Sequence, residues 1–293
     1  KTAFSFQYGA STPEELCARA KELDYFALGL SDLNTLSSAP RMHRAAKKHQ
    51  LKLCIGSEIT PEDAPPVLLY AMNRKGYHKL SRLITLGRRR APKGQSQLFL
   101  SDILNDPQDL LAMTPAKTMT AALSALKDGF EDRFYLLCSR HYEAHDFESI
   151  EQMKTLAKSL DLPLIANNDV HFHAPQRQDL HAIMTCLKEH KTLHEIGQDI
   201  FQNGERYLKS PQSMKELLGS LFPRALEQGI DAAKRCLFSL DEIRYEYPKE
   251  ICPDNLTEAK YLRQLTWKGA ELRYPKGIPD KTKGLIRHEL KLI

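Results

Sequence analysis

The chain reads Leu162-Pro163-Leu164-Ile165-Ala166 and then Asn167-Asn168-Asp169-Val170-His171-Phe172, a short apolar run followed at once by polar residues. The apolar run is typical of a buried parallel strand. Because side chains alternate along an extended chain, Asp169 and His171 are expected on one side, just past the carboxyl end of that strand. Such a pair can share a divalent metal, but the spacing also fits an aspartate that caps the next helix beside a surface histidine.

Short apolar strands alternate with helices on both sides of this stretch. The first helix is the best signalled, because Thr12 is a good N-cap, Pro13 suits the first helical position and Glu15 completes a capping box. The alternation predicts a parallel α/β fold. Strands are expected at 26–30, 51–55, 67–72, 134–138 and 162–166, and helices at 12–23, 41–49, 77–86 and 147–160.

Polar side chains of metal-ligand type stand where several of these strands end. They are Asp32, Glu58, His141, Asp169 and His171. In α/β barrels the carboxyl ends of the strands form the functional face, so the five residues are candidates for one metal site. The alternative is that polar residues follow strands simply because loops are polar.

Length and composition set further bounds. The 293 residues, 42% of them apolar, suffice for one large domain or for a large and a small one. No apolar run reaches membrane-spanning length, and nothing at the start resembles a signal peptide. The 6 cysteines are scattered, which argues against a disulfide framework and a structural zinc site and favours the cytoplasm. Because the chain starts at Lys1 without a methionine, we expect a trimmed piece of a longer protein.

The segment from Arg88 to about Asp132 is less regular, and it opens on a basic run. Arg88, Arg89 and Arg90, followed by Lys93, are expected in a loop. The net charge of +5 permits contact with DNA but does not require it. The run is therefore either a weak DNA-binding site or a solvated loop.

From Pro175 onward the pattern becomes helical. A stretch containing Tyr245-Glu246-Tyr247-Pro248 reads as a linker, so a domain boundary is expected near residue 245. Thr257 is expected to cap the helix that follows the linker. The helices are expected at 176–187, 212–218, 223–236, 257–273 and 281–293.

Several segments, taken in order, resemble the N-terminal part of bacterial DNA polymerase III alpha subunits. They are 9–16, 56–58, 168–172, 206–210 and 261–270. Phe4-Ser5-Phe6 and Leu265-Thr266-Trp267 are most similar to the error-prone branch of that family. The resemblance implies a PHP (polymerase and histidinol phosphatase) domain over 1–244, with a distorted (β/α)7 barrel fold. It implies that 245–293 form a linker and a small helical segment leading to the polymerase core.

The resemblance also implies a metal site that is incomplete here. Asp32, Glu58, His141, Asp169 and His171 match ligand positions of the family. Other ligand positions carry residues that cannot bind a cation: Lys1 in the opening H-x-H motif, Leu33 in the T-D-H motif, and Pro65 or Pro66 in place of a histidine. Leucine and proline supply no lone pair, and a lysine opposes a second cation. Either one Mg²⁺, Mn²⁺ or Zn²⁺ still binds, or lysine or arginine neutralises the carboxylates.

The parent protein implied by the resemblance is a DNA-directed DNA polymerase, a nucleotidyltransferase that uses Mg²⁺ in replication and in translesion synthesis after damage. The palm aspartates of that family lie further along, so this chain alone is not expected to polymerise DNA. We expect a structural and interaction module whose partners are DNA, the polymerase core of the same chain and accessory polymerase or clamp-associated proteins, with no membrane. The alternative is an active metal-dependent phosphoesterase, either a 3′-5′ exonuclease or a pyrophosphatase.

Overall fold

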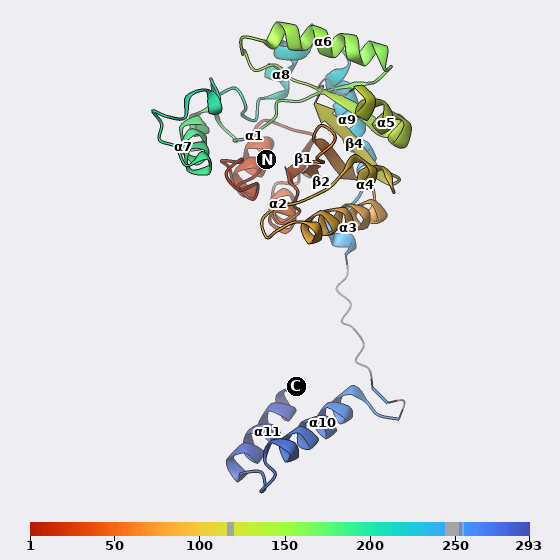
Figure 1. Cartoon of the computed structure of the whole chain (residues 1–293), viewed down its shortest axis with the longest axis vertical. Coiled ribbons are helices and arrows are strands. Elements are labelled where there is room, and N and C mark those ends of the chain that lie inside the picture. Colours follow the sequence, from red (N-terminus) through yellow and green to blue (C-terminus); the bar gives the residue numbers. More distant parts are fainter. Residues whose placement is uncertain (116–119, 244–251, 254) are drawn as a thin grey trace. The chain divides into compact units, whose positions relative to one another are not determined.

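The computed structural model describes residues 1–115, 120–243, 252–253 and 255–293, and the chain divides into two compact units, Lys1–Ile243 and Arg244–Ile293 (Figure 1). The second unit contains helices α10 (Glu258–Arg273) and α11 (Asp280–Leu292). The predicted linker at 245–248 lies outside the described residues. The sheet and all candidate site residues belong to the first unit.

Within the described residues the first unit is built on one six-stranded, curled sheet whose strands lie side by side in chain order. The strands are β1 (Ala27–Leu33), β2 (Lys52–Ile59), β3 (Val67–Ala71), β4 (Leu110–Pro115), β5 (Phe134–Cys138) and β6 (Leu164–Ala166). With the helices that surround it, this sheet confirms the predicted α/β fold of the PHP type. The described strands leave β1 and β6 as the two edges rather than a closed ring.

The prediction of a wholly parallel sheet is wrong for one strand. β1 and β2 are parallel, as are β4, β5 and β6, but β3 is antiparallel to both of its neighbours. The reason is the short connection between β2 and β3, residues 60–66, which contains no crossover helix. A parallel pair needs a crossover of a dozen residues or more, whereas a short connection returns the chain antiparallel.

Helices cover the sheet and account for most of the remaining chain in the first unit. Helix α1 begins as predicted, because Thr12 and Glu15 form a reciprocal capping box. The helices are α1 (Pro13–Glu22), α2 (Ala39–Lys48), α3 (Arg74–Arg90), α4 (Leu100–Leu104), α5 (Thr120–Phe130), α6 (Asp146–Ser159), α7 (Gln178–Glu189), α8 (Pro211–Leu218) and α9 (Ala225–Arg235), with short 3₁₀ turns at 131–133, 175–177, 197–199 and 240–242.

The two faces of the sheet are buried by different partners. Val67 and Leu69 of β3 pack with Leu80 of α3 and Leu126 of α5, forming a core on one face. The alternating residues Leu68 and Tyr70 face the other way and pack, with Leu137 of β5, against Ala232 of α9 and Cys236 just beyond it. Helix α9 contacts both edge strands, β1 and β6. It therefore lies across this face of the curled sheet, between the two edge strands.

Two other predictions need correction. The segment expected to be irregular contains α4, β4 and α5, and helix α3 continues through Arg90, so the three arginines lie on its last turn rather than in a loop. Thr257 does stand at the N-cap of α10, but its side chain makes no capping hydrogen bond. None of the described helices is both long and apolar enough to span a membrane.

Candidate functional site

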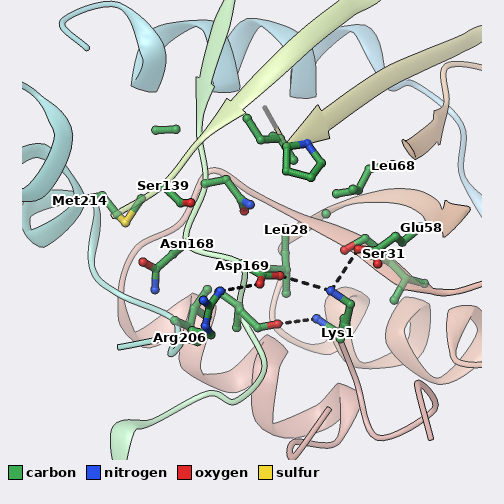
Figure 2. Close-up of a pocket in the computed structure, with 18 of the residues that line it drawn as sticks. Lys1, Leu28, Ser31, Glu58, Leu68, Ser139, Asn168, Asp169, Arg206 and Met214 are labelled. Carbon is green, nitrogen blue, oxygen red and sulfur yellow. Dashed lines mark hydrogen bonds and ion pairs between the residues drawn. The ribbon is translucent and has the colours of Figure 1, made fainter. Parts of the chain in front are cut away.

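A cavity of about 670 Å³ lies beside the carboxyl ends of β1, β5 and β6, where the sequence predicts a site. Its lining includes Glu58, His141, Asp169 and Arg206, and Lys1 reaches into it from the start of the chain (Figure 2). Four of these five side chains carry a formal charge, and the fifth, His141, can be protonated. The chemical character of the cavity therefore depends on how those charges pair.

Lys1 is the centre of the charge pairing. Its Nζ lies 3.0 Å from Glu58 Oε2 and 3.2 Å from Asp169 Oδ1, and its side chain is 9% exposed. Its backbone nitrogen donates to Val170 O at 2.6 Å. Burial alone lowers the pKa of the amine, but Asp169 and Glu58 outweigh that effect and hold the pKa above its ordinary value. A charged ammonium thus links β2 to the segment after β6.

Asp169 carries a second cation on its other oxygen. Its Oδ2 accepts from Arg206 Nη1 at 2.7 Å, and Arg206 Nη2 donates to Glu143 Oε1 at 3.0 Å. The guanidinium also stacks over the ring of Phe201, 4.5 Å from its centroid. Burial tends to raise the pKa of Asp169, but His171, Lys1 and Arg206 together hold it well below its ordinary value. Asp169 is therefore an ionised carboxylate with a cation on each oxygen.

Asp32 lies close by, but its carboxylate accepts hydrogen bonds from neutral donors instead of forming ion pairs. It is fully buried, and its Oδ1 accepts from the backbone nitrogen of Thr2 at 2.6 Å and from Ser5 Oγ at 2.7 Å. Its Oδ2 accepts from Thr2 Oγ1 at 2.7 Å and from the Ser38 hydroxyl. Four donors fill the lone pairs of one carboxylate. Asp32 thus anchors the segment that carries Lys1 and, as placed here, has no oxygen left for a metal.

The two candidate histidines are both buried. His171 Nδ1 donates to Tyr8 O at 2.6 Å, and its Nε2 lies 3.4 Å from Asp169 Oδ2. His141 Nε2 donates to Asn168 O at 3.1 Å. Burial is the main cause that lowers the pKa of each ring. His171 therefore belongs to the Asp169 cluster, whereas His141 supports the loop that carries Asp169.

The sequence predicts that Asp169 and His171 meet, but for the wrong reason. Strand β6 ends at Ala166, and Asp169 has a left-handed backbone with φ of 42°. Aspartate tolerates that conformation better than most residues. Phe172 then forms an isolated parallel bridge with Tyr207, and His171 N donates to Arg206 O. A turn, not strand alternation, brings Asp169 to the cavity with His171 Nε2 3.4 Å from its Oδ2 and Arg206 alongside.

Sequence reasoning missed Arg206 and Glu143 as members of the site. Arg206 opens the segment 206–210, which carries part of the family resemblance, so a signal was present. Lys209 in the same segment is also buried, and its Nζ lies 3.0 Å from Glu205 Oε2. Burial lowers the pKa of this amine. The half-buried Arg206 and the buried Lys209 each pair with a carboxylate, as charges removed from water normally do.

The residues present do not fit a cluster of metal ions. Two cations, Lys1 and Arg206, pair with three carboxylates, those of Glu58, Asp169 and Glu143. Across residues 1–115, 120–243, 252–253 and 255–293, no group of three or more His, Cys, Asp or Glu side chains is arranged to hold a metal. Of the positions expected to lack a ligand, Pro66 lines the cavity and Leu33 lies opposite Glu58 in the sheet.

The four basic residues predicted to contact DNA, Arg88, Arg89, Arg90 and Lys93, differ in whether their side chains already have partners. Arg88 donates to the carbonyls of Gly94 and Gln95, both at 3.0 Å, and Arg90 pairs with Asp102 at 2.6 Å. Arg89 and Lys93 are exposed, and their side chains make no hydrogen bond or ion pair with the described residues. Two of the four predicted DNA contacts thus already serve the fold.

The chain is similar along its whole length to known proteins. The chain is 41% identical over 297 residues to an error-prone DNA polymerase of Methylococcus capsulatus and 33% identical over 308 residues to one of Rhodopirellula baltica. These alignments cover 99% and 100% of the chain but only 28% and 27% of the relatives, so the chain spans little more than a quarter of their length.

A solved structure named as a metal-dependent phosphoesterase, from Bifidobacterium adolescentis, resembles the chain with a TM-score of 0.44 and 13% identity, covering 72% of this chain and 91% of that one. The family model of the PHP domain matches residues 1–161, more than half of the chain. The chain therefore belongs to the PHP domain family.

Proposed function

We propose that this chain is the N-terminal PHP region of an error-prone DNA polymerase, and that ion pairs have taken the place of metal ions in its site. The observation that carries the proposal is the Lys1 ammonium lying between Glu58 and Asp169, at 3.0 and 3.2 Å. The two relatives compared above, which match almost the whole chain and are named error-prone DNA polymerases, support the first half.

In this proposal the cluster has a structural role. Lys1 and Arg206 together join the start of the chain, β2, the turn after β6 and the segment around 206. A divalent metal would join the same carboxylates through coordination bonds. Removing Lys1 leaves Glu58 and Asp169 without their shared cation and should cost up to about 3 kcal/mol. Removing Arg206 should cost less, because its partners Asp169 and Glu143 are 36% and 34% exposed and solvent screens the pair. The cluster would thus rigidify the face that a catalytic PHP domain uses for chemistry.

The proposed partners follow from the parent protein. The polymerase core of the same chain would be the covalent partner, DNA the substrate of that core, and accessory polymerase or clamp-associated proteins further partners. Mg²⁺ would serve the polymerase core rather than the PHP site. The five residues Asp32, Glu58, His141, Asp169 and His171 are proposed as the remains of a metal site, not as working ligands.

The first experiment is elemental analysis of the purified chain by inductively coupled plasma mass spectrometry, beside the variants Asp169→Ala and Lys1→Gln. Asp231→Ala, an exposed carboxylate on α9, is the matched control. We expect no stoichiometric Mg, Mn or Zn in the unmodified chain and no change in melting temperature with EDTA. Lys1→Gln should melt at a lower temperature, because Glu58 and Asp169 lose their shared cation.

The opposite result is equally clear. Near-stoichiometric metal that disappears in Asp169→Ala, with Mn²⁺-dependent hydrolysis of a phosphodiester, would overturn the structural role and favour the phosphoesterase alternative. The Asp231→Ala control should retain whatever metal the unmodified chain holds.

A further inference from the structure

Helix α3 is the most one-sided charged element of the first unit. Its 17 residues, Arg74–Arg90, include seven lysines and arginines and no aspartate or glutamate. Charge of one sign on a single helix is normally balanced by acidic residues on the elements packed against it. The neighbouring elements balance only part of this charge.

One edge of α3 is neutralised by the loops beside it. Lys79 pairs with Asp106 at 2.7 Å and with Asp109 at 3.3 Å, and Arg90 pairs with Asp102. Arg88, on the opposite edge, donates to backbone carbonyls, including Asn34 O at 3.1 Å. These three cations hold the helix to the sheet connections and are not available to a partner.

The outward face of α3 keeps a row of unpaired cations. Lys75, Arg82 and Arg89 are exposed, and none of their side chains makes a hydrogen bond or an ion pair with the described residues. The positions are seven apart, so they stay on one face and, at about 1.5 Å per residue, span about 21 Å. Hydrogen bonds from Asn73 and Lys79 are the main causes that lower the pKa of Asp109. The charge of Lys75 adds a smaller effect at longer range.

A groove lies along a different face of α3, where Arg88, and none of the three cations of the row, lines it. This cavity of about 410 Å³ lies between α3 and the segment after β1, and its lining combines the polar residues Asn34, Thr35, Ser37 and Ser81 with Leu36, Tyr77 and Ile84. No carboxylate lines it. Hydroxyl and amide groups donate hydrogen bonds to phosphate and sugar oxygens without adding negative charge. The groove therefore adds no negative charge that would repel a phosphate strand from α3.

We propose that the Lys75–Arg82–Arg89 face of α3 binds the phosphate backbone of a nucleic acid strand. A lipid surface fits less well, because the only large apolar side chain exposed on α3 is Leu86 and interfacial helices bury a broad apolar face. None of the three cations lines the cavity that holds Lys1 and Asp169, so the binding is independent of any metal. The proposal goes beyond the structural role and does not depend on it.

The test is binding of a fluorescent oligothymidine to the 293-residue chain by anisotropy, across a series of salt concentrations. The triple variant Lys75→Gln, Arg82→Gln, Arg89→Gln removes the row. The control variant Lys154→Gln, Lys158→Gln, Lys215→Gln removes the same net charge from α6 and α8. Each phosphate contact on a single strand contributes about 0.7 to the slope of log K against log salt concentration, so the row variant should lower the slope by about 2.

We expect the control to keep most of the affinity and the full slope, and poly-glutamate of equal charge to compete poorly. Equal affinity and slope in the row variant and the unmodified chain would overturn the proposal, as would equal losses in the two variants. Poly-glutamate that competes as well as the oligonucleotide would instead indicate an acidic protein partner. Circular dichroism of both variants checks that each remains folded.

Discussion

Asp32 and Asp169 show how two aspartates near strand ends differ in chemistry through their neighbours alone. Asp32 accepts from neutral hydroxyl and backbone donors, whereas Asp169 accepts from an ammonium and a guanidinium. The sequence identifies both as acidic residues near strand ends. Lys1 and Leu33, which stand at ligand positions of the family, already exclude a complete set of metal ligands. What the sequence does not show is which donors meet each oxygen, because those donors lie up to 168 residues away along the chain.

His181 makes a residue-scale prediction about acid stability. Its ring stacks on Phe201 with centroids 4.5 Å apart, and burial, with His171 nearby, lowers its pKa to about 4. An unfolded histidine titrates near pH 6.5, so between these values the unfolded chain binds more protons than the folded one. Stability from the neutral ring is therefore present above about pH 6.5 and is lost as the pH falls towards 4.

The variant His181→Phe keeps the aromatic packing and removes the titration. Between pH 6.5 and 4, its free energy of unfolding should fall less steeply than that of the unmodified chain, by up to about 1.4 kcal/mol per pH unit for one proton. Urea denaturation at several pH values measures the difference, with the exposed His145→Phe as control. Parallel curves for the His181→Phe variant and the unmodified chain would contradict the prediction.

At the scale of elements, local sequence signals predict where helices and strands lie, but they do not predict how distant strands pair. The capping box at Thr12 and Glu15 fixes the start of α1, and the apolar run at 134–138 coincides with β5. The reversal of β3 depends instead on the length of the loop before it, and the true end of β6 on the turn at Asp169. The alternation of strands and helices is thus readable from sequence, whereas strand direction and turns need the tertiary contacts.

Gly56 offers a test of how tightly β2 and β3 pair. A Cβ at this position would lie 2.4 Å from Leu69 O and 2.6 Å from Tyr70 Cδ1. Gly56→Ala must therefore shift backbone or tilt the Tyr70 ring, and we expect a loss of about 1–3 kcal/mol in the free energy of unfolding.

The control for that variant is Gly229→Ala in α9, where a Cβ would make only an ordinary 3.5 Å contact with Ile165. Because alanine favours a helix interior over glycine, this control should be neutral or stabilising by up to about 1 kcal/mol. Urea denaturation monitored by circular dichroism compares the two. If Gly56→Ala is as stable as the unmodified chain, the close approach of Tyr70 to β2 is wrong.

At the scale of the whole molecule, the packed core belongs to the first unit. The four clusters of buried hydrophobic residues all lie within residues 1–243. In the second unit Ala270 is the one buried residue among those described, and Leu265, Leu272 and Leu292 are exposed. A helix pair with so little buried apolar surface is marginal by itself, since most helical stability comes from packing. In the proposed parent protein, the polymerase core would supply the missing surface.

This division predicts that a chain ending at Ile243 melts like the full chain. If the second unit adds no stabilising contact, the melting temperature should change by less than about 2 °C, which for a domain of this size corresponds to less than about 1 kcal/mol. The helical signal of α10 and α11 should be lost gradually on heating rather than in a second cooperative step. Differential scanning calorimetry and circular dichroism of both chains measure this. A drop of several degrees on truncation would show instead that the last 50 residues stabilise the PHP unit, and the boundary near residue 244 would no longer mark an independent domain.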